Sequence, residues 1–414
     1  MKLEIKRITE SDYPSTHRIL SNSYPDFTMP KKSAYEWFDK IINPDKTRDF
    51  WGAFIDSQQV GVFVTNDFTL NFRNQLISAG GIGMVAVDLL HKKEKICKQM
   101  IEFYENYYRE KETNLLVLYP FRPDFYHKMG FGFGSTLHAY SIEPNQFPKY
   151  PKTNKLDYAS LDDLAEITDF YNQQVKSLHG AMLRQERELE GWLKSNKMRC
   201  LLYRENKQLQ GYLFFYFDER LPENKGSFDI KVKEMQFKSV DVWRQFSTFL
   251  NSQADQVKRI QYTTFDPDFY HYFGTPNNET NLYYHPIQQN ISLEKTGLMY
   301  KIIDPLKFFE TLQDNTYDTM DLTIRFELEN ELFPKNRKII LTYNFANKKI
   351  VQNEVTSDLT IKLNLARFSS LVIGALSFSS AVKHGLVEVN NKNHIDCVDK
   401  LLRTKNMPVG YNEF

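Results

Sequence analysis

The sequence has few cysteines and no recognisable spacing of metal ligands. Its three cysteines, Cys97, Cys200 and Cys397, are an odd number spread over 414 residues. Such a set provides neither a disulfide framework nor a zinc site, so we expect a reducing compartment. The nine histidines form no HExxH element or other paired arrangement. Because no spacing of metal ligands is present, we expect no bound metal. The Gly-x-Ser-x-Gly, Walker and dinucleotide-binding fingerprints are also missing.

Long apolar runs and an excess of one charge are missing as well. The first residues, MKLEIKRITE, contain no apolar core of a secretory signal. The longest apolar stretch, SSLVIGALSF at 369–378, is too short and too polar to span a bilayer. Lys and Arg number 53 against 52 Asp and Glu, so the excess of positive charge that phosphate-rich partners require is not there. We therefore expect a cytoplasmic protein without nucleic-acid or membrane partners.

The chain is rich in residues that build cores. Hydrophobic residues make up 41% of it and aromatic residues 14%, a composition unlike that of disordered proteins. A length of 414 residues suggests two to four domains.

A five-residue string, PDFYH, occurs twice, at 123–127 and at 267–271. Each copy follows a β-rich run and a Pro-bearing turn, and a glycine comes three residues after its end. Upstream, the stretch 51–68 resembles 200–217, and both are typical of two strands joined by a short polar turn. Two matched features in the same order and at nearly the same spacing predict a duplicated domain.

The repeat divides the chain into two similar domains and a remainder. We place the domains at 1–148, 149–287 and 288–414, with the Pro-rich FPKYPK segment at the first boundary. The first domain is predicted to contain, in order, a strand at 3–8, helical regions at 12–20 and 31–42, a hairpin at 51–70, a strand at 82–87, a helix at 93–108 and strands at 114–119 and 133–142. The third is expected to be α+β, with strands at LTIRFEL and KIILTYNF and a helix near 364–374.

The two copies differ where a strand runs into a helix. In the first copy, GIGMVAV leads into a turn that contains the basic residues His91, Lys92, Lys93, Lys95 and Lys98. A helix N-terminus offers unpaired N–H groups and the positive end of the helix dipole, so a basic cluster there favours phosphate binding over a merely solvated surface. The matching stretch of the second copy, MQFKSVDVWRQFSTFL, has a shorter turn with little positive charge.

This order of strand, basic turn, helix, strand and FYHKMGFG resembles the GNAT superfamily of acetyl-CoA-dependent N-acetyltransferases. More narrowly, the whole chain resembles the Eis (enhanced intracellular survival) family, in VAVDLLHKKEKICKQM, FYHKMGFG, GLMYKIIDP and the terminal YNEF. The resemblance implies an α+β fold with an active GNAT domain, a degenerate GNAT domain and a C-terminal domain similar to sterol carrier proteins. It also implies a mixed sheet with flanking helices in each GNAT domain, and a homo-oligomer, a hexamer.

The resemblance also assigns a cofactor site and a proton donor. Val85, Ala86 and Val87 would hold the pantetheine arm of acetyl-CoA through backbone hydrogen bonds. The turn that cradles the pyrophosphate would consist of Lys92, Lys93, Glu94, Lys95, Ile96, Cys97 and Lys98. Tyr126 would donate a proton to the leaving thiolate, since a phenol with a pKa near 10 can donate to a thiolate whose conjugate acid is near 8.5. The alternative is a packed aromatic side chain, and Tyr270 fills the same place in the second copy.

The last residue would supply the general base. In Eis-like enzymes the chain ends on an aromatic residue whose α-carboxylate takes that role, and this sequence ends with Phe414. Chain ends are usually frayed, which by itself favours a disordered tail. A free α-carboxyl has a pKa of roughly 3.3–3.7, so it would need burial to become more basic, or would act by holding the amine. Asp26 and Glu413 are the candidates for attracting a cationic amine.

One departure from the family pattern bears on function. The usual turn follows Arg/Gln-x-x-Gly-x-Gly/Ala, but Lys92 stands at the first position, Lys95 at the glycine position and Cys97 at the small-residue position. Lys95 either compensates by reaching a phosphate or blocks the turn, and Glu94 adds a negative charge. The first hypothesis is an N-acetyltransferase that acts on primary amines such as aminoglycosides, polyamines or lysine side chains. The alternatives are a catalytically inactive protein of this fold that binds a ligand or partner, and a lipid carrier built around the C-terminal domain.

Overall fold

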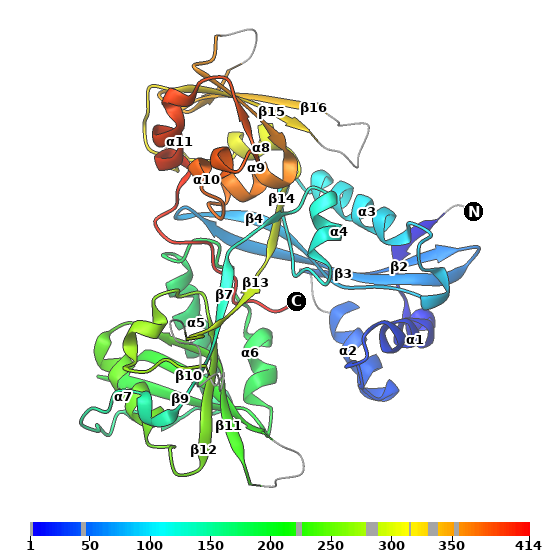
Figure 1. Cartoon of the computed structure of the whole chain (residues 1–414). Helices are drawn as coiled ribbons and strands as arrows, with labels where there is room; N and C mark the ends of the chain where they lie inside the picture. Colours follow the sequence, from blue (N-terminus) through cyan, green and yellow to red (C-terminus); the bar gives the residue numbers. More distant parts are fainter. Residues whose placement is uncertain are drawn as a thin grey trace. The chain divides into compact units, whose positions relative to one another are not determined.

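The computed structural model describes residues 3–42, 47–220, 226–278, 289–313, 316–329, 338–351 and 356–414. These residues form two compact units (Figure 1). The first unit consists of Met1–Gly134, His179–Met182 and Leu298–Phe414, and the second of Ser135–Leu178 and Leu183–Gly297. Helices and mixed sheets occur in both units, which confirms the predicted α+β class. None of the described helices has the length and apolar character that crossing a bilayer requires.

A seven-stranded mixed sheet forms the base of the first unit. Its strands, in spatial order, are β1 (Glu4–Arg7), β2 (Arg48–Ile55), β3 (Gln58–Phe72), β4 (Gln75–Val87), β5 (Leu115–Leu118), β14 (Met299–Ile302) and β6 (Gly132–Phe133). Neighbouring strands are antiparallel, apart from the parallel pair β4 and β5.

Helices cover both faces of this sheet (Figure 1). They are α1 (Tyr13–Ser23), α2 (Lys31–Ile42), α3 (Ile96–Glu110) and α4 (Pro123–Lys128). The helix α3 buries Ile96, Met100, Ile101, Tyr104 and Tyr108, the three-to-four spacing expected of a helix that packs one side on a sheet. On the other face, α1 and α2 share a core with Phe50, Val62 and Val64 of the sheet.

The second unit repeats this plan. Its seven strands, in spatial order, are β13 (Leu293–Thr296), β7 (Thr136–Ile142), β12 (Val257–Thr264), β11 (Phe228–Phe237), β10 (Gln208–Glu219), β9 (Arg199–Glu205) and β8 (Leu156–Tyr158). Again one pair, β11 and β12, is parallel. The helices are α5 (Leu164–Val175), α6 (Glu186–Leu193) and α7 (Val240–Asn251), and the second PDFYH copy ends in a short helix, η5 (Phe269–Tyr272).

Each sheet takes a strand from outside its own copy of the repeat. The strand predicted to end the first copy, 133–142, is two strands, and its longer part, β7, pairs with β12 in the second sheet. The segment predicted to open the third domain supplies β13 to the second sheet and β14 to the first. Alternating apolar residues mark these segments as strands, but they do not specify which sheet a strand joins.

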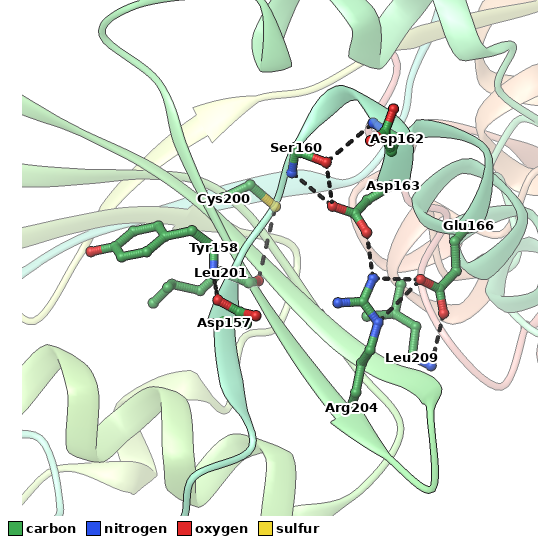
Figure 2. A network of polar contacts seen from close by, with 10 residues as sticks. All are labelled: Asp157, Tyr158, Ser160, Asp162, Asp163, Glu166, Cys200, Leu201, Arg204 and Leu209. Atoms are coloured by element: carbon green, nitrogen blue, oxygen red, sulfur yellow. Dashed lines mark hydrogen bonds and ion pairs between the residues drawn. The ribbon is translucent and has the colours of Figure 1, made fainter.

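A polar network ties the first helix of the second unit to its hairpin (Figure 2). Asp163 accepts hydrogen bonds from the backbone and hydroxyl of Ser160 at 2.7 and 3.1 Å, which closes a capping box before α5. Arg204 of β9 donates to Asp163 and to Glu166, each at 2.6 Å. The other oxygen of Glu166 accepts from the Leu209 N–H at 3.1 Å, so the network fixes α5 on the β9–β10 hairpin.

The C-terminal part of the first unit contains a third, five-stranded sheet. Its order is β17 (Lys349–Ile350), β16 (Lys338–Asn344), β15 (Thr323–Glu329), β18 (Leu359–Asn364) and β19 (Glu388–Val389). The helices of this part are α8 (Pro305–Glu310), α9 (Leu365–Val372), α10 (Phe378–Lys383) and α11 (Ile395–Leu402). The strands and the helix predicted here from LTIRFEL, KIILTYNF and 364–374 are β15, β16 and α9.

Candidate active site

The parallel strands β4 and β5 stay together only over a short stretch. Their pairing covers residues 79–81 of β4 and 115–117 of β5, and beyond it β4 continues along β3 to Val87. Between Gly83 and Ala86, β4 has one more residue than β3, and Met84 in this bulge has a left-handed φ of 53°. A bulge bends a strand and redirects its backbone groups. The end of β4 therefore diverges from β5, and we call the edge of β4 that is left unpaired beyond Gly81 the slot.

Backbone groups of β4 face this slot. The Asp88 N–H donates to the Val60 carbonyl of β3 at 2.8 Å, so by alternation the groups of Val85 and Val87 point away from β3. Two side chains from the end of α1 reach them: the Tyr24 hydroxyl donates to the Val85 carbonyl at 2.9 Å, and Ser23 Oγ donates to that of Val87 at 3.2 Å. Ala86, between them, is buried in the core with 3% exposure.

A cavity of about 540 Å³ lies where β4 ends and α3 begins. It is lined by Val87, His91, Lys92, Lys93, Lys95, Ile96, Cys97, Lys98, Phe125, Lys128 and Met129. Seven of the ten residues expected to bind the cofactor are among these, and Val85, Ala86 and Glu94 are not. The volume is in the range of small-molecule sites, and the lining combines an apolar floor with several lysines.

The positive charge of this cavity is largely uncompensated. His91 is paired with Glu94, with 3.1 Å between Nδ1 and Oε2, and Lys98 with Glu102 at 3.8 Å. Within the part of the chain that the structure describes, Lys92, Lys93 and Lys95 form no ion pair. The acidic residue predicted to oppose an anion, Glu94, is thus turned to His91. Cations beside the N-terminus of a 15-residue helix suit a phosphate group.

Lys95 adopts the backbone conformation that glycine favours. Its φ of 63° and ψ of 15° are left-handed, and it is the N-cap residue of α3. A residue with a Cβ occupies that region at a cost of roughly 1–2 kcal/mol. The backbone of the turn thus has the left-handed conformation that a glycine would adopt. Because lysine stands at this position instead of glycine, a cation lies on the cavity wall.

Tyr126 is on α4, with 7% of its surface exposed. Burial raises its pKa, and the Cys97 thiol and the Tyr24 hydroxyl raise it further. Burial also raises the pKa of Cys97 to about 12 and that of Tyr24 to about 12. Lys301 of β14 supports this region, because it pairs with Glu105 of α3 and donates to the Met129 carbonyl at 2.7 Å.

The end of the sequence packs on β4. A Cβ atom at Gly83 would lie 2.7 Å from the carboxyl carbon of Phe414 and 2.9 Å from its oxygen, and one at Gly81 would lie 3.0 Å from its ring. Both glycines are on the same face of the strand, since side chains alternate. The Phe414 ring is 4.8 Å from that of Phe68 and 5.5 Å from that of Tyr119, between centroids. The strand thus leaves room for the tail only because these two positions lack side chains.

The tail is not frayed, contrary to the expectation from its terminal position. Pro408, Val409 and Gly410 are buried, and Asn412 has no exposed surface. The Tyr119 hydroxyl donates to the Gly410 carbonyl at 2.9 Å. The predicted amine-attracting residues are both exposed: Glu413 is beside Phe414, and Asp26 lies in the connection between α1 and α2. Among the described residues the Asp26 carboxylate forms no hydrogen bond or ion pair.

Several residues of the site were missed by sequence reasoning. Tyr24 could not be found, because nothing in its neighbourhood predicts that its hydroxyl reaches β4. Gly81 and Gly83 carried a usable signal, since glycines at alternate positions of a strand mark a close approach of another chain segment. Among the described residues, no three His, Cys, Asp or Glu side chains come together as metal ligands would.

Comparisons with known proteins agree with this geometry. Residues 4–134 and residues 180–283 each match a family model for an acetyltransferase (GNAT) domain. The chain therefore carries two GNAT acetyltransferase domains in tandem, as the repeat predicted. A search of curated proteins finds no significant match for the sequence.

Solved structures share the whole fold at low sequence identity. A GCN5-related N-acetyltransferase from Anabaena variabilis has a TM-score of 0.81 at 14% identity, over 100% of both chains. A conserved protein from Enterococcus faecalis, described as a probable N-acyltransferase, has a TM-score of 0.81 at 16% identity, again over 100% of both. Eis1 from Mycobacterium abscessus has a TM-score of 0.76 at 14% identity, over 100% of both. Identities this low establish a shared fold, and the activity must be argued from the site.

Proposed function

We propose that the protein is an acetyl-CoA-dependent N-acetyltransferase that acts on a primary amine. One observation supports this most strongly: the carboxyl group of Phe414 lies against Gly83, one residue before the bulge at which β4 turns away from β5. A transfer from CoA to an amine requires a cationic site for the CoA phosphates and an acidic group near the amine. The lysine-lined cavity and the Phe414 carboxyl group would provide these at the two ends of the slot.

The cavity would bind the phosphates and the slot the acyl-bearing arm. Lys92, Lys93 and Lys95 provide charge for a pyrophosphate at the start of α3, and the backbone of Val85 and Val87 faces the place of the pantetheine amides. Backbone N–H groups there would also polarise the thioester carbonyl, a form of stabilisation that costs little reorganisation. The Val85 carbonyl already accepts a hydrogen bond from the Tyr24 hydroxyl, but its second lone pair could accept another from a ligand.

At the other end, the Phe414 carboxylate would accept the proton that the amine loses as its nitrogen attacks the thioester carbon. The carbon–sulfur bond then breaks and the electron pair goes to sulfur. The packing of the Phe414 ring between Phe68 and Tyr119 partly desolvates this end of the chain, which favours proton uptake by a carboxylate. Asp26 and Glu413 would increase the local concentration of a cationic amine by their charge.

Tyr126 would donate a proton to the leaving sulfur. Its raised pKa keeps the hydroxyl protonated at neutral pH, but it also makes complete transfer to a solvated thiolate less favourable. Burial in the same surroundings raises the pKa of the Cys97 thiol to about 12. A CoA thiolate that leaves next to Tyr126 would lose hydration in the same way, so the acidities of donor and acceptor would remain matched.

The second candidate is a protein of this fold that binds a ligand or partner without catalysis. Lys95 is the observation that favours it, because a long side chain on the wall of the cavity occupies space that glycine leaves free. The acceptor classes named by the family resemblance, aminoglycosides, polyamines and lysine side chains, are all cationic amines. They are the first compounds to test.

The test is a calorimetric titration with acetyl-CoA, followed by a screen of primary amines for CoA release. The natural protein is expected to bind acetyl-CoA in the micromolar range and to release CoA only when an amine is present. If the natural protein gives no heat and Lys95→Gly binds, the cofactor site of the natural protein is closed, the acetyltransferase proposal fails, and the search turns to a ligand other than CoA. If neither binds acetyl-CoA, the acetyltransferase proposal fails.

A further inference from the structure

A four-residue segment of the second copy belongs to the first unit. Residues 179–182 lie in sequence between α5 and α6, and the chain leaves the second unit after Leu178 and returns to it at Leu183. The segment is firmly packed, with His179 at 7% exposure and Ala181 and Met182 at 0%. We call these four residues, His179–Met182, the inserted loop.

The inserted loop pairs with the tip of β3. The Gly180 N–H donates to the Asn71 carbonyl at 2.7 Å, and the Asn71 N–H donates to the Ala181 carbonyl at 2.8 Å. The Arg73 N–H donates to Nδ1 of His179 at 3.1 Å. The loop is thus hydrogen-bonded to the end of β3, where the chain turns into β4.

The His179 ring is held from two sides. Since Nδ1 accepts from Arg73, the neutral ring carries its proton on Nε2, which donates to the Ile373 carbonyl at 2.8 Å, just after α9. Both ring nitrogens therefore have partners, and the orientation of the backbone at His179 is fixed. This rigidity matters because the same residue also contacts the tail.

The loop holds the C-terminal tail by its backbone. The Val409 N–H donates to the His179 carbonyl at 2.8 Å. Gly180 has a left-handed φ of +83°, and a Cβ there would lie 2.7 Å from Cβ of Pro408 and 2.8 Å from the Val409 nitrogen. The tail lies this close to the loop only because position 180 has no side chain. Phe414 follows Val409 by five residues and packs on Gly83.

We propose that the inserted loop is a clamp that fixes the tail at Pro408 and Val409 and thereby aims the Phe414 carboxyl group at Gly83. His179 and Gly180 are positioning residues in this account and have no contact with the reacting atoms. The second copy, which lacks a basic turn of its own, thus supplies part of the machinery of the first. The catalytic consequence rests on the proposed acetyltransferase function, whereas the holding of the tail does not.

The test compares Gly180→Ala with Gly385→Ala. Gly385 has a similar left-handed φ of +65° and no atom within 4 Å of an added Cβ, so it reproduces the backbone strain without touching the tail. Gly180→Ala is expected to accelerate hydrogen exchange in residues 405–414 at least tenfold. It should lower kcat by about tenfold to a hundredfold, since a small misplacement of a reacting group is costly, and leave the Kd for acetyl-CoA unchanged. Gly385→Ala should change none of these.

A second pair of variants acts from the tail side. Val409→Pro removes the N–H that donates to His179, whereas Val409→Ala keeps it and removes only methyl groups. Faster exchange at the end of the tail is expected for the proline variant and not for the alanine variant. Equal tail protection in Gly180→Ala and Gly385→Ala would overturn the clamp. If the natural protein shows no acetyl transfer, the proposed function fails, and the exchange measurement still decides whether the clamp exists.

Discussion

The two GNAT copies have the same framework and differ in the turn after one strand. Both β4 and β11 have an extra residue relative to their antiparallel neighbour, and both pair in parallel with the strand after the next helix. In the first copy, residues 88–95 separate β4 from α3, and four of them line the cavity: His91, Lys92, Lys93 and Lys95. In the second copy only Lys238 and Ser239 separate β11 from α7.

The copies also differ beside the bulge itself. In the second copy Glu234 follows the extra residue, and its two carboxylate oxygens accept from Arg184, each at 2.7 Å. Both side chains are almost fully buried, at 3% and 2% exposure. The bulge of the first copy consists of Met84 and Val85, which have no charge to pair. The comparison teaches that the GNAT framework is compatible with a connection of only two residues after this strand, with a buried, paired carboxylate and guanidinium beside the bulge.

The largest effect is expected from Gly83→Ala. The added Cβ would lie 2.7 Å from the carboxyl carbon of Phe414 and displace it, so we expect kcat to fall by about 10³-fold with an unchanged Kd for acetyl-CoA. The control in the second copy is Gly191→Ala, in α6, where an added Cβ meets no atom within 4 Å. Steady-state kinetics and calorimetry of both variants check this. Equal activity of the two variants would remove Phe414 from the reaction.

The duplicated tyrosines provide the next comparison. Tyr126→Phe removes the proposed proton donor, and kcat is expected to fall by about 10²-fold, within the usual range for general acid catalysis. Tyr270→Phe, in the same string of the second copy, should leave kcat within twofold. Each variant is compared with the natural protein under saturating acetyl-CoA and amine. A loss of the same size in both would show that the string has a structural role in each copy.

Acid should destabilise the first unit through His179. Burial, together with the positive charge of Arg73, lowers the pKa of this histidine from 6.5 to about 4. The unfolded chain therefore binds more protons between these values, so stability is complete above pH 6.5 and declines as the pH falls towards 4. The shift corresponds to about 3 kcal/mol. After correction for the intrinsic pH dependence of amide exchange, the protection factors of β4 peptides should fall more steeply than those of β10 peptides as the pH is lowered through this window.

The control for the acid effect is His179→Gln. This variant has no titrating ring at position 179, so the difference in unfolding free energy between it and the natural protein should narrow from pH 7 to pH 4.5. A constant difference would mean that folding does not shift the pKa of His179.

The smallest effect is expected when two lysines with left-handed backbones, one in each copy, are replaced and the variants compared. Lys95 has a φ of 63° and Lys207, in the β9–β10 turn, a φ of 64°. Replacing either by glycine relieves strain, and we expect each variant to gain up to about 1 kcal/mol in unfolding free energy, or about 2–4 °C in Tm. Only Lys95→Gly should change the affinity for acetyl-CoA, by severalfold. A change in affinity in Lys207→Gly would indicate an effect of general stability.

Local pattern predicted much of the fold. The helix at 31–42 has the predicted bounds, because apolar residues at helical spacing, such as Ala34, Phe38 and Ile41, leave no other periodicity. The sheets that β7 and β14 join could not be predicted, since a strand with one apolar face fits any sheet edge that buries it. The same limit applies to His179, whose partners Arg73, Ile373 and Val409 are far from it in sequence.

The candidate site was predictable where a charge pattern marked it. The lysine cluster after β4 identified the cavity because few other roles gather so many cations at a helix start. The left-handed conformation of Lys95 could not be predicted from the sequence, because a lysine does not indicate a left-handed backbone. The close approach of Phe414 to Gly83 depends on the fold of the C-terminal part, because the two residues are 331 positions apart in the sequence.

The central claim is that the carboxylate at the end of the chain takes part in the reaction. The most direct test adds one glycine after Phe414 and compares the rate of amine-dependent CoA release with that of a protein extended by one glycine at its N-terminus. The account predicts that the C-terminal extension lowers kcat by at least a hundredfold without weakening acetyl-CoA binding, because the carboxylate no longer lies at Gly83. Full activity of the extended protein would contradict it.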